Sequence, residues 1–379
     1  MNSSEVVVAG LGGLGSGAFY HLARRGVSVV GLERFGLAHD RGSSHGESRM
    51  IRKAYIEHPD YIPLVLRAFD LWDELQKESG KHLLYRLPLV LCGTPDSDAV
   101  RGSLLAAERY NVDIQSLSRE EVSRRFPGLN LPPGMEAVLE QDAGCLMVED
   151  CVAAHVQRGK AHGGDASFGE ALLDWTEHPG HVQIRTTRGV REAKCLILTA
   201  GAWSSRVTKN LPVPLSVVRK SQVWFPAAGP EYAAGSGAPA FYFELDTGIF
   251  YGFPSFDGST CKVACHSGGE PVADPLQLDR ELHSEDVAPL TDFLARCLPG
   301  VGSDPVKHSI CMYTHSPDHH FVIDRLPGSQ RVLFAGGFSG HGFKFASVLG
   351  EALADLATTG STRLPVEFLS INRPGLQAE

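Results

Sequence analysis

A glycine-rich turn between an apolar run and an amphipathic stretch constrains the fold of this chain more than any other feature. Residues 5–9 (EVVVA) are apolar and mostly β-branched, as expected of a parallel strand buried on both faces. The turn that follows contains Gly10, Gly12 and Gly15 in the pattern G-x-G-x-x-G. A helical pattern comes next, and residues 27–32 predict a second strand. This order predicts the βαβ unit of a Rossmann-like nucleotide-binding domain.

Each glycine of the turn, and one acidic residue beyond it, has a physical reason. The first glycine allows a tight turn, the second lets the backbone approach a pyrophosphate, and the third lets the helix pack closely on the strand. The N-terminus of the helix offers free N–H groups to phosphates. Glu33, at the end of the second strand, can accept hydrogen bonds from ribose hydroxyls and would repel a 2′-phosphate, which disfavours NADP. FAD and NAD share this fingerprint, so the turn alone leaves the choice between them open.

The composition indicates a soluble globular chain with more than one domain. Its 379 residues suggest two or three domains, and 43% hydrophobic with 21% charged residues is close to the average. A formal net charge of −9 disfavours binding to nucleic acid or to an anionic membrane. No apolar run is long enough for a transmembrane helix, and the N-terminal apolar stretch lacks the basic flank of a signal peptide. Eight irregularly spaced cysteines argue against a disulfide scaffold, so we expect a cytoplasmic protein.

Elements of the nucleotide-binding type recur in the middle and at the end of the chain. Residues 195–200 predict a buried strand, and residues 332–335 predict a last strand before a second glycine-rich turn. Between about 217 and 263 the pattern instead alternates, as in a half-buried sheet. Helices are predicted over 61–79, 119–126, 283–298 and 343 to about 357, the second with a capping box from Ser118 to Glu121. These patterns predict an α/β fold with a sheet-rich α+β second domain, both domains being discontinuous in sequence.

Three further stretches do not belong in an ordinary NAD dehydrogenase. They are residues 42–52 (GSSHGESRMIR), residues 251–255 (YGFPS) followed by Lys262 and His266, and residues 311–314 (CMYT) with 337–344 (GFSGHGFK). At these stretches the chain resembles the monomeric sarcosine oxidase family of FAD-dependent amine oxidases. That family includes sarcosine, N-methyltryptophan and pipecolate oxidases. The resemblance extends from Val6 to residues 370–374.

The resemblance implies an FAD-binding domain and a substrate or catalytic domain. The expected FAD-binding segments are 1–85, 145–215 and 322–379, and the expected substrate segments are 86–144 and 216–321. It also implies that the flavin is attached through a thioether from its 8α carbon to Cys311. The residues expected to bind the cofactor are Gly10, Gly12, Gly15, Glu33, Ser43, Ser44, Arg49, Gly201, Cys311, Gly337, Gly340, Gly342 and Lys344.

The same resemblance implies a substrate site beside the flavin. Arg52 and Lys344 match residues that bind a substrate carboxylate, for which arginine supplies a fork of donors and lysine a point cation. Lys262 matches a lysine that promotes the reaction with oxygen, and a buried cation there would stabilise superoxide. The residues 336–343 would point N–H groups and a helix dipole at the negative charge of reduced flavin. His45, Arg49, Tyr251, His266 and Tyr313 match active-site positions near the flavin or the substrate.

These features predict an oxidase of a secondary amine or imino acid that carries a carboxylate, either an N-methyl amino acid or a cyclic imino acid. The neutral amine would give a hydride equivalent to the flavin, and O₂ would then be reduced to H₂O₂. One alternative is a dehydrogenase with another electron acceptor, against which Lys262 argues. A less favoured alternative is an NAD-binding Rossmann protein. The resemblance also favours a monomer.

Other kinds of site find little support in the sequence. Cys261, Cys265 and His266 lack the paired spacing of a zinc site, as do the histidines between 315 and 320, so no metal is predicted. A serine hydrolase is not predicted either. Tyr242 lies in a region that lines the pocket in relatives. Whether Tyr242 narrows the cavity or stacks on a ring is left open. The identity of the substrate is therefore left open as well.

Overall fold

The predicted βαβ unit forms at the N-terminus of the structure, a computed structural model that describes residues 3–208 and 211–376. β1 (Ser3–Ala9) runs parallel to β2 (Val29–Glu33), and α1 (Gly13–Arg24) connects them. Val6 to Ala9 are buried, which explains the unbroken apolar run. The predicted FAD-binding segments also include 1–2, 209–210 and 377–379, which lie outside the described residues.

The first sheet is mixed and has eight strands in the described part of the chain. Besides β1 and β2 it contains β9 (Asp165–Phe168), β10 (Leu172–His178), β11 (His181–Thr186), β12 (Gly189–Leu198), β19 (Val322–Arg325) and β20 (Val332–Gly336). β9, β2, β1, β12 and β20 are parallel neighbours, and β10 and β11 extend β12 as antiparallel strands. The predicted strands at 195–200 and 332–335 are therefore confirmed. Parallel strands far apart in sequence thus share one edge, where their carboxyl ends meet.

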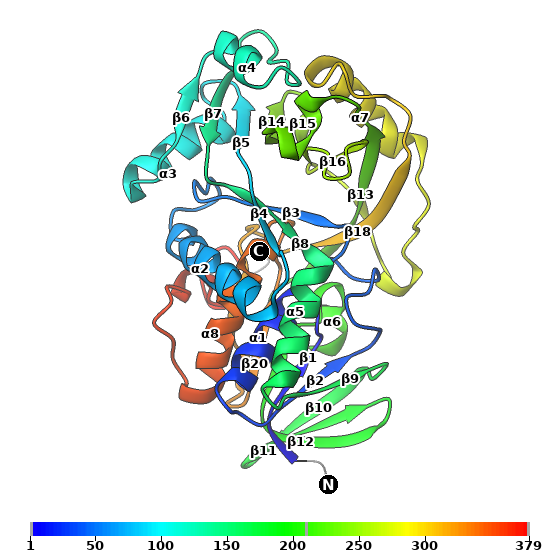
Figure 1. The fold of residues 1–379 in the computed structure, drawn as a ribbon. Coiled ribbons are helices and arrows are strands. Elements are labelled where there is room, and N and C mark those ends of the chain that lie inside the picture. Colours follow the sequence, from blue (N-terminus) through cyan, green and yellow to red (C-terminus); the bar gives the residue numbers. More distant parts are fainter. Residues whose placement is uncertain (1–2, 209–210, 377–379) are drawn as a thin grey trace.

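Four helices lie together beside this sheet (Figure 1). They are α1, α2 (Tyr61–Ser79), α5 (Val148–Ala161) and α8 (Ala346–Thr359). Their apolar faces form one core with the sheet, in which Phe19, Trp72 and Leu349 are fully buried. The prediction of α2 is confirmed, whereas the helix expected from 343 begins at Ala346. Phe343–Phe345 form a 3₁₀ turn, because the chain leaves the preceding glycine turn too tightly for α-helical bonds.

A second sheet, of nine strands in the described residues, lies above the first one in Figure 1. Its strands are β5 (Leu89–Gly93), β6 (Gln115–Leu117), β7 (Glu136–Glu140), β13 (Ser216–Pro226), β14 (Ala240–Leu245), β15 (Gly248–Phe253), β16 (Thr260–Cys265), β17 (Glu270–Pro271) and β18 (Lys307–His315). One face packs on α7 (Ser284–Cys297), where Phe250 stacks on Phe293 at a centroid distance of 4.8 Å. The alternating apolar and polar pattern predicted between 217 and 263 thus belongs to a sheet that packs one of its faces against α7.

Shorter elements complete the described chain. They are α3 (Ser103–Tyr110), α4 (Arg119–Arg125), α6 (Ser204–Val207) and a three-stranded sheet of β3 (Ser48–Ile51), β8 (Gly144–Met147) and β4 (Leu84–Arg86). The capping box of Ser118 and Glu121 is present at the start of α4. The small sheet lies between the two large ones (Figure 1).

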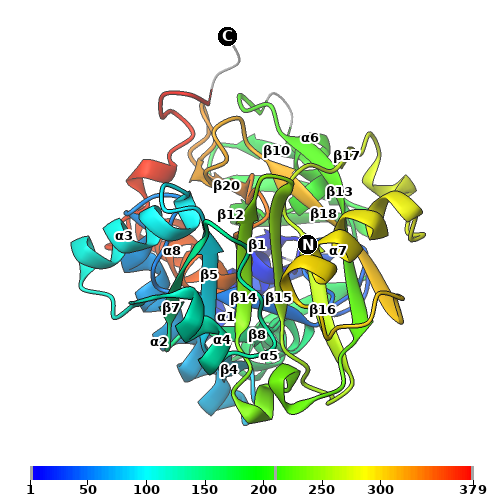
Figure 2. The ribbon, with the colours of Figure 1, turned by 90° about the horizontal axis from the view of Figure 1, so that it is seen from above.

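The two large sheets are stacked end on, and this stacking positions the site. In Figure 1 β1 runs upward, so its carboxyl end points toward the second sheet. Figure 2, seen from above, shows β14 and β15 in front of β1. No helix in the described residues combines the length and apolar character needed to cross a membrane. The domain boundaries stated above remain a prediction.

Candidate functional site

A cavity lies where the carboxyl ends of β1, β2 and β12 face the second sheet. The glycine turns after β1 and β20 form part of its wall, and aromatic side chains of β14, β15 and β18 form another part. The predicted residues that line it are Gly10, Gly12, Glu33, Ser43, Ser44, Arg49, Arg52, Gly201, Tyr242, Tyr251, His266, Tyr313, Gly337, Gly340, Gly342 and Lys344. The other predicted residues, Gly15, His45, Lys262 and Cys311, lie outside this lining, and their contacts are described below.

The first and the third glycine of the first turn leave no room for a side chain. Gly10 has φ +101°, and a Cβ on it would lie 2.5 Å from the carbonyl oxygen of Thr199. A Cβ on Gly15 would lie 1.8 Å from the carbonyl oxygen of Gly10, so only glycine lets α1 begin this close to β1. Gly13 N donates a hydrogen bond of 3.0 Å to Ser44 Oγ, which ties the predicted Ser44 to the turn. The tight turn and the close packing of the helix on the strand that were expected of Gly10 and Gly15 are therefore present.

Glu33 is positioned as an ionised acceptor beside this turn. Its carboxylate accepts hydrogen bonds from Leu11 N and Phe35 N, both at 2.9 Å, and lies 3.2 Å from His39 Nε2. Burial alone would raise the pKa of Glu33, but His39 and the two backbone N–H groups lower it below its ordinary value. A charged acid at the end of β2 fits the ribose of a dinucleotide and disfavours a 2′-phosphate.

The second glycine turn packs closely against β18. Gly337 and Gly340 have φ of +65° and +82°, and a Cβ on Gly340 would lie 2.5 Å from the Tyr313 ring. Ser339 N donates to Thr314 O at 2.9 Å, which fixes the turn against the strand. Because α8 begins only at Ala346, the backbone N–H groups near the cavity belong to the turn and its 3₁₀ continuation rather than to the first α-helical turn.

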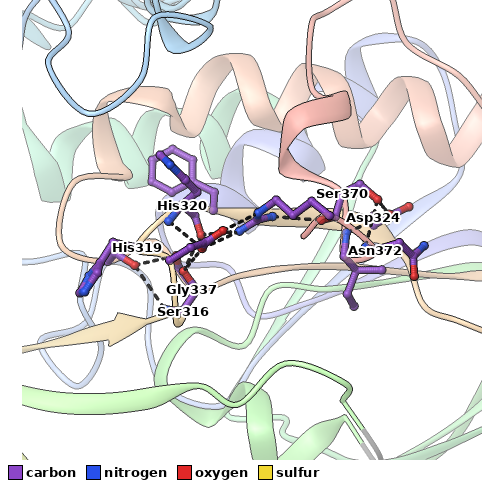
Figure 3. Close-up of polar contacts among 12 residues, drawn as sticks. Ser316, His319, His320, Asp324, Gly337, Ser370 and Asn372 are labelled. Atoms are coloured by element: carbon purple, nitrogen blue, oxygen red, sulfur yellow. Dashed lines mark hydrogen bonds and ion pairs between the residues drawn. The ribbon is translucent and has the colours of Figure 1, made fainter. Parts of the chain in front are cut away.

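A polar network behind this turn binds the segment 370–374 to the stretch 318–324 (Figure 3). Arg373 donates to both carboxylate oxygens of Asp318, at 2.7 and 2.9 Å. Ser370 donates to Asp324 at 2.6 Å, so the C-terminal segment is attached on both sides of the 318–324 stretch. That stretch also carries the carbonyl of His319, which accepts from His341 of the glycine turn. These contacts give the segment a structural role in supporting the wall of the cavity.

Two buried basic side chains in the lining of the cavity lie beside aromatic rings. Arg52 is 3% exposed, and its guanidinium lies 4.8 Å from the centre of the Tyr55 ring and 6.0 Å from that of Tyr242. The ammonium group of Lys344 lies 5.2 Å from the same Tyr55 ring and donates to His341 O at 3.0 Å. Tyr242 therefore places its ring beside the Arg52 guanidinium.

An internal carboxylate, Glu57, accepts from one nitrogen of the Arg52 guanidinium. Its two oxygens accept from Nη2 of Arg52 at 3.0 and 2.9 Å, and Nη1 donates to Ala54 O at 2.6 Å. Burial alone would raise the pKa of Glu57, but Arg52, His341 and Lys344 lower it to about 2. Burial lowers the pKa of Lys344 to about 7, with Glu57 acting in the opposite direction. The contact between Arg52 and Glu57 thus shows that this part of the cavity can hold a carboxylate anion.

Three predicted residues form an aromatic wall between the two ends. Tyr251 and Tyr313 bring their hydroxyl oxygens within 3.5 Å, and the His266 ring lies 5.4 Å from that of Tyr313. Burial, followed by the nearby charge of Lys220, lowers the pKa of His266 to about 4. His266 is therefore neutral at pH 7 and can accept a hydrogen bond.

His45 and Arg49 connect the loop after β2 to the second sheet. Burial lowers the pKa of His45 to about 3, so this histidine is neutral. It donates from Nε2 to Gly42 O and accepts at Nδ1 from Ser309 Oγ, both at 3.0 Å. Arg49 donates to Ser43 O at 2.9 Å. His45 therefore lies behind the cavity wall, while Arg49 forms part of it.

Lys262 is enclosed rather than exposed to the cavity. It is 3% exposed, and its ammonium group donates to Gly46 O at 2.5 Å, to Ser48 O at 2.9 Å and to Ser48 Oγ at 3.2 Å. It also lies 5.2 Å from the centre of the Trp224 ring. Burial lowers the pKa of Lys262 well below its ordinary value. Its three acceptors belong to the segment next to Arg49, so the lysine lies one layer behind the wall.

Several residues at the site were not identified from the sequence. Glu57 and Tyr55 lie in an irregular stretch without a helix or strand pattern, and no signal marks them. Lys220 and Gln222 do carry a signal, since they belong to a run of four polar residues, 219–222, with apolar residues on either side of it in the strand. Lys220 donates to the carbonyls of 266–268, at 3.1, 2.7 and 3.2 Å.

Comparison with known proteins agrees with this geometry. A family described as FAD dependent oxidoreductase matches residues 5–356, and the chain belongs to this family. Its relatives include monomeric sarcosine oxidases from Streptomyces avermitilis and Arthrobacter sp. (strain TE1826). They are 40% and 38% identical, over 97% and 98% of this chain and 97% of each relative. N-methyl-L-tryptophan oxidase from Yersinia pestis is 32% identical over 97% of this chain and 99% of the relative.

Among solved structures, the fold is similar to that of NikD, described as an unusual amino acid oxidase essential for nikkomycin biosynthesis. The two chains match over 100% of both, with a TM-score of 0.88 and 24% identity. The resemblance identified from the sequence and the predicted fold class are therefore confirmed. The dependence on FAD fits the crowded glycine turn and the acid at the end of β2.

Proposed function

We propose that this chain oxidises a secondary amine or imino acid that carries a carboxylate, using FAD and O₂. The observation that carries the proposal is the meeting of Arg52 and Lys344 around the Tyr55 ring in the lining of the cavity. A substrate carboxylate would take the place of Glu57 on the Arg52 fork. The names of the relatives, sarcosine oxidase and N-methyl-L-tryptophan oxidase, support this class of substrate.

The residues of the chain suggest a division of roles. FAD, when bound, accepts the hydride equivalent from the carbon next to nitrogen and passes the electrons to O₂, giving H₂O₂. Arg52 and Lys344 would fix the carboxylate, and neutral His266 would accept a hydrogen bond from the substrate nitrogen. Tyr251 and Tyr313 would form the wall that excludes water. Lys262 is proposed as the cation that favours the reaction with O₂ from behind the segment 46–48.

We also propose that FAD is attached covalently to Cys311. This cysteine is 1% exposed, and its neighbours Met312 and Tyr313 line the cavity. After denaturation in acid or detergent, the yellow colour is expected to stay on the polypeptide, because a thioether survives unfolding. A Cys311→Ser variant is expected to release its flavin under the same treatment. Complete release of flavin from the natural chain would remove Cys311 as the attachment site.

The affinity for a carboxylate is expected to fall as the pH rises through about 7. The pKa of Lys344 is lowered to about 7, so Lys344 is charged below this pH and neutral above it. Glu57, with a pKa of about 2, and His266, with a pKa of about 4, do not titrate in this range. Inhibition by acetate, which has no amine, isolates the effect when measured from pH 6 to 9. The Lys344→Met variant should bind acetate weakly and without this pH dependence; an unchanged profile would contradict the assignment.

The proposal includes a monomer that works in the cytoplasm. It is supported by the sparse, irregularly spaced cysteines, which argue against a disulfide scaffold, and by relatives named monomeric sarcosine oxidase. Sedimentation of the holoprotein is expected to give the mass of a single chain with its flavin. A stable dimer would contradict the proposed state.

A further inference from the structure

Gln222 contacts the thiol to which FAD is proposed to be attached. Its Nε2 donates to Cys311 Sγ at 3.0 Å, and its Oε1 accepts from Arg49 Nη1 at 3.3 Å. Only 1% of Gln222 is exposed. In the register of β13 and β18, Gln222 is opposite Ser309 and Lys220 is opposite Cys311, so these side chains share one face of the strand pair.

The contacts of Gln222 fix the orientation of its amide. A guanidinium has only donors, so the amide oxygen must face Arg49 and the amide nitrogen must face the sulfur. Gly46 leaves the space for this arrangement, because a Cβ there would lie 2.3 Å from Oε1 of Gln222. The donor end of the glutamine is thus held toward the thiol by an arginine on the opposite side.

Three basic side chains lie near the sulfur of Cys311. Lys220, Lys262 and Arg280 all lie within electrostatic reach of the thiol. An N–H group bonded to sulfur stabilises the thiolate more than the thiol, and the thiolate is the nucleophilic form. A valine or leucine at position 222 would also fill this site in the buried strand, but it could not donate a hydrogen bond to the sulfur of Cys311.

We propose that Gln222 is a positioning residue for the attachment of FAD, holding the sulfur of Cys311 in a fixed orientation for the bond to the cofactor. This inference rests on the proposed covalent bond at Cys311. In that step the sulfur bonds to the 8α carbon of FAD, while the thiol and the 8α methyl group each lose one hydrogen. Together the two hydrogens amount to two protons and two electrons, which reduce the flavin ring. O₂, the electron acceptor of the proposed oxidase, then removes them as H₂O₂.

The test measures how fast the full chain, produced under riboflavin depletion, becomes covalently labelled after FAD is added. Flavin fluorescence of the denatured chain on a gel reports the coupling, and flavin absorbance reports that each variant binds FAD. Gln222→Met keeps the size of the side chain but loses the donor, and it is expected to slow coupling about tenfold or more. Gln222→Glu keeps the contact with Arg49 but cannot donate when ionised, and it is expected to slow coupling at least as much.

The two variants separate this role from a purely structural one. If Gln222 only anchored Arg49, Gln222→Glu would couple at the natural rate, and that result would overturn the inference. Gln183→Met, at an exposed position of β11, is the matched control and should couple normally. Equal rates in the natural chain and both Gln222 variants would also overturn the inference while leaving the bond to Cys311 intact. A natural chain that binds FAD without coupling would overturn the bond itself and the role of Gln222 with it.

Discussion

Replacing Arg52 with methionine is expected to raise the KM for a carboxylate substrate by roughly 30-fold to several thousand-fold. This range corresponds to the loss of about 2–5 kcal/mol when one partner of a buried charge pair is removed. Arg52 is 3% exposed and makes the two-oxygen contact with Glu57 that a substrate carboxylate would replace. Methionine fills much of the space between Tyr55 and Tyr242 without the charge, so the loss is assigned to the guanidinium rather than to packing. Steady-state kinetics with peroxide detection gives the values.

Two controls define what this result means. An N-methyl amine without a carboxylate should be oxidised with a similar KM by the natural chain and by Arg52→Met. Glu57→Gln removes the charge that competes for Arg52, so this variant is expected to bind carboxylate substrates more tightly. An unchanged KM in Arg52→Met would exclude Arg52 from the substrate site.

Replacing Lys262 with methionine is expected to slow the reaction of reduced flavin with O₂ by about 10²–10³-fold. This is the effect of removing one preorganised group that stabilises a developing negative charge. The anaerobic reduction of flavin by substrate should change far less, because Lys262 lies behind the segment 46–48 and away from Arg52 and Lys344. Stopped-flow absorbance measures the two half-reactions separately.

Lys307 provides a matched control for this experiment. Its ammonium group lies 4.9 Å from the centre of the Trp224 ring that Lys262 also contacts, but its side chain is 53% exposed. Lys307→Met should therefore leave the oxygen reaction unchanged. If Lys262→Met slowed both half-reactions equally, the lysine would have a general structural role and no specific role in the oxygen reaction.

Much of the nucleotide end could be predicted from the sequence because its physics is local. The order of strand, glycine turn and helix depends on neighbouring residues, and Glu33 follows from the end of the second strand. The start of the last helix was predicted three residues too early, since sequence periodicity does not separate a 3₁₀ turn from an α-helix.

The substrate end could be predicted only in part, and only through the resemblance. The contact between Cys311 and Gln222 depends on the register of β13 with β18, across 89 residues of sequence. The hydrogen bonds that enclose Lys262 join it to Gly46 and Ser48, which are 216 and 214 positions away in the sequence. Glu57 is close to Arg52 in sequence, but it lies in a stretch whose backbone follows no regular pattern. Local propensities carry no information on such contacts.

The most direct test follows the flavin through one turnover. The purified chain is mixed without oxygen with a panel of N-methyl amino acids and cyclic imino acids, and the visible absorbance of the oxidised flavin is recorded. We predict that at least one compound bleaches the flavin and that added O₂ restores the colour with one H₂O₂ per flavin. A chain without flavin absorbance, or one that is bleached but returns no peroxide with O₂, would contradict the assignment as an oxidase.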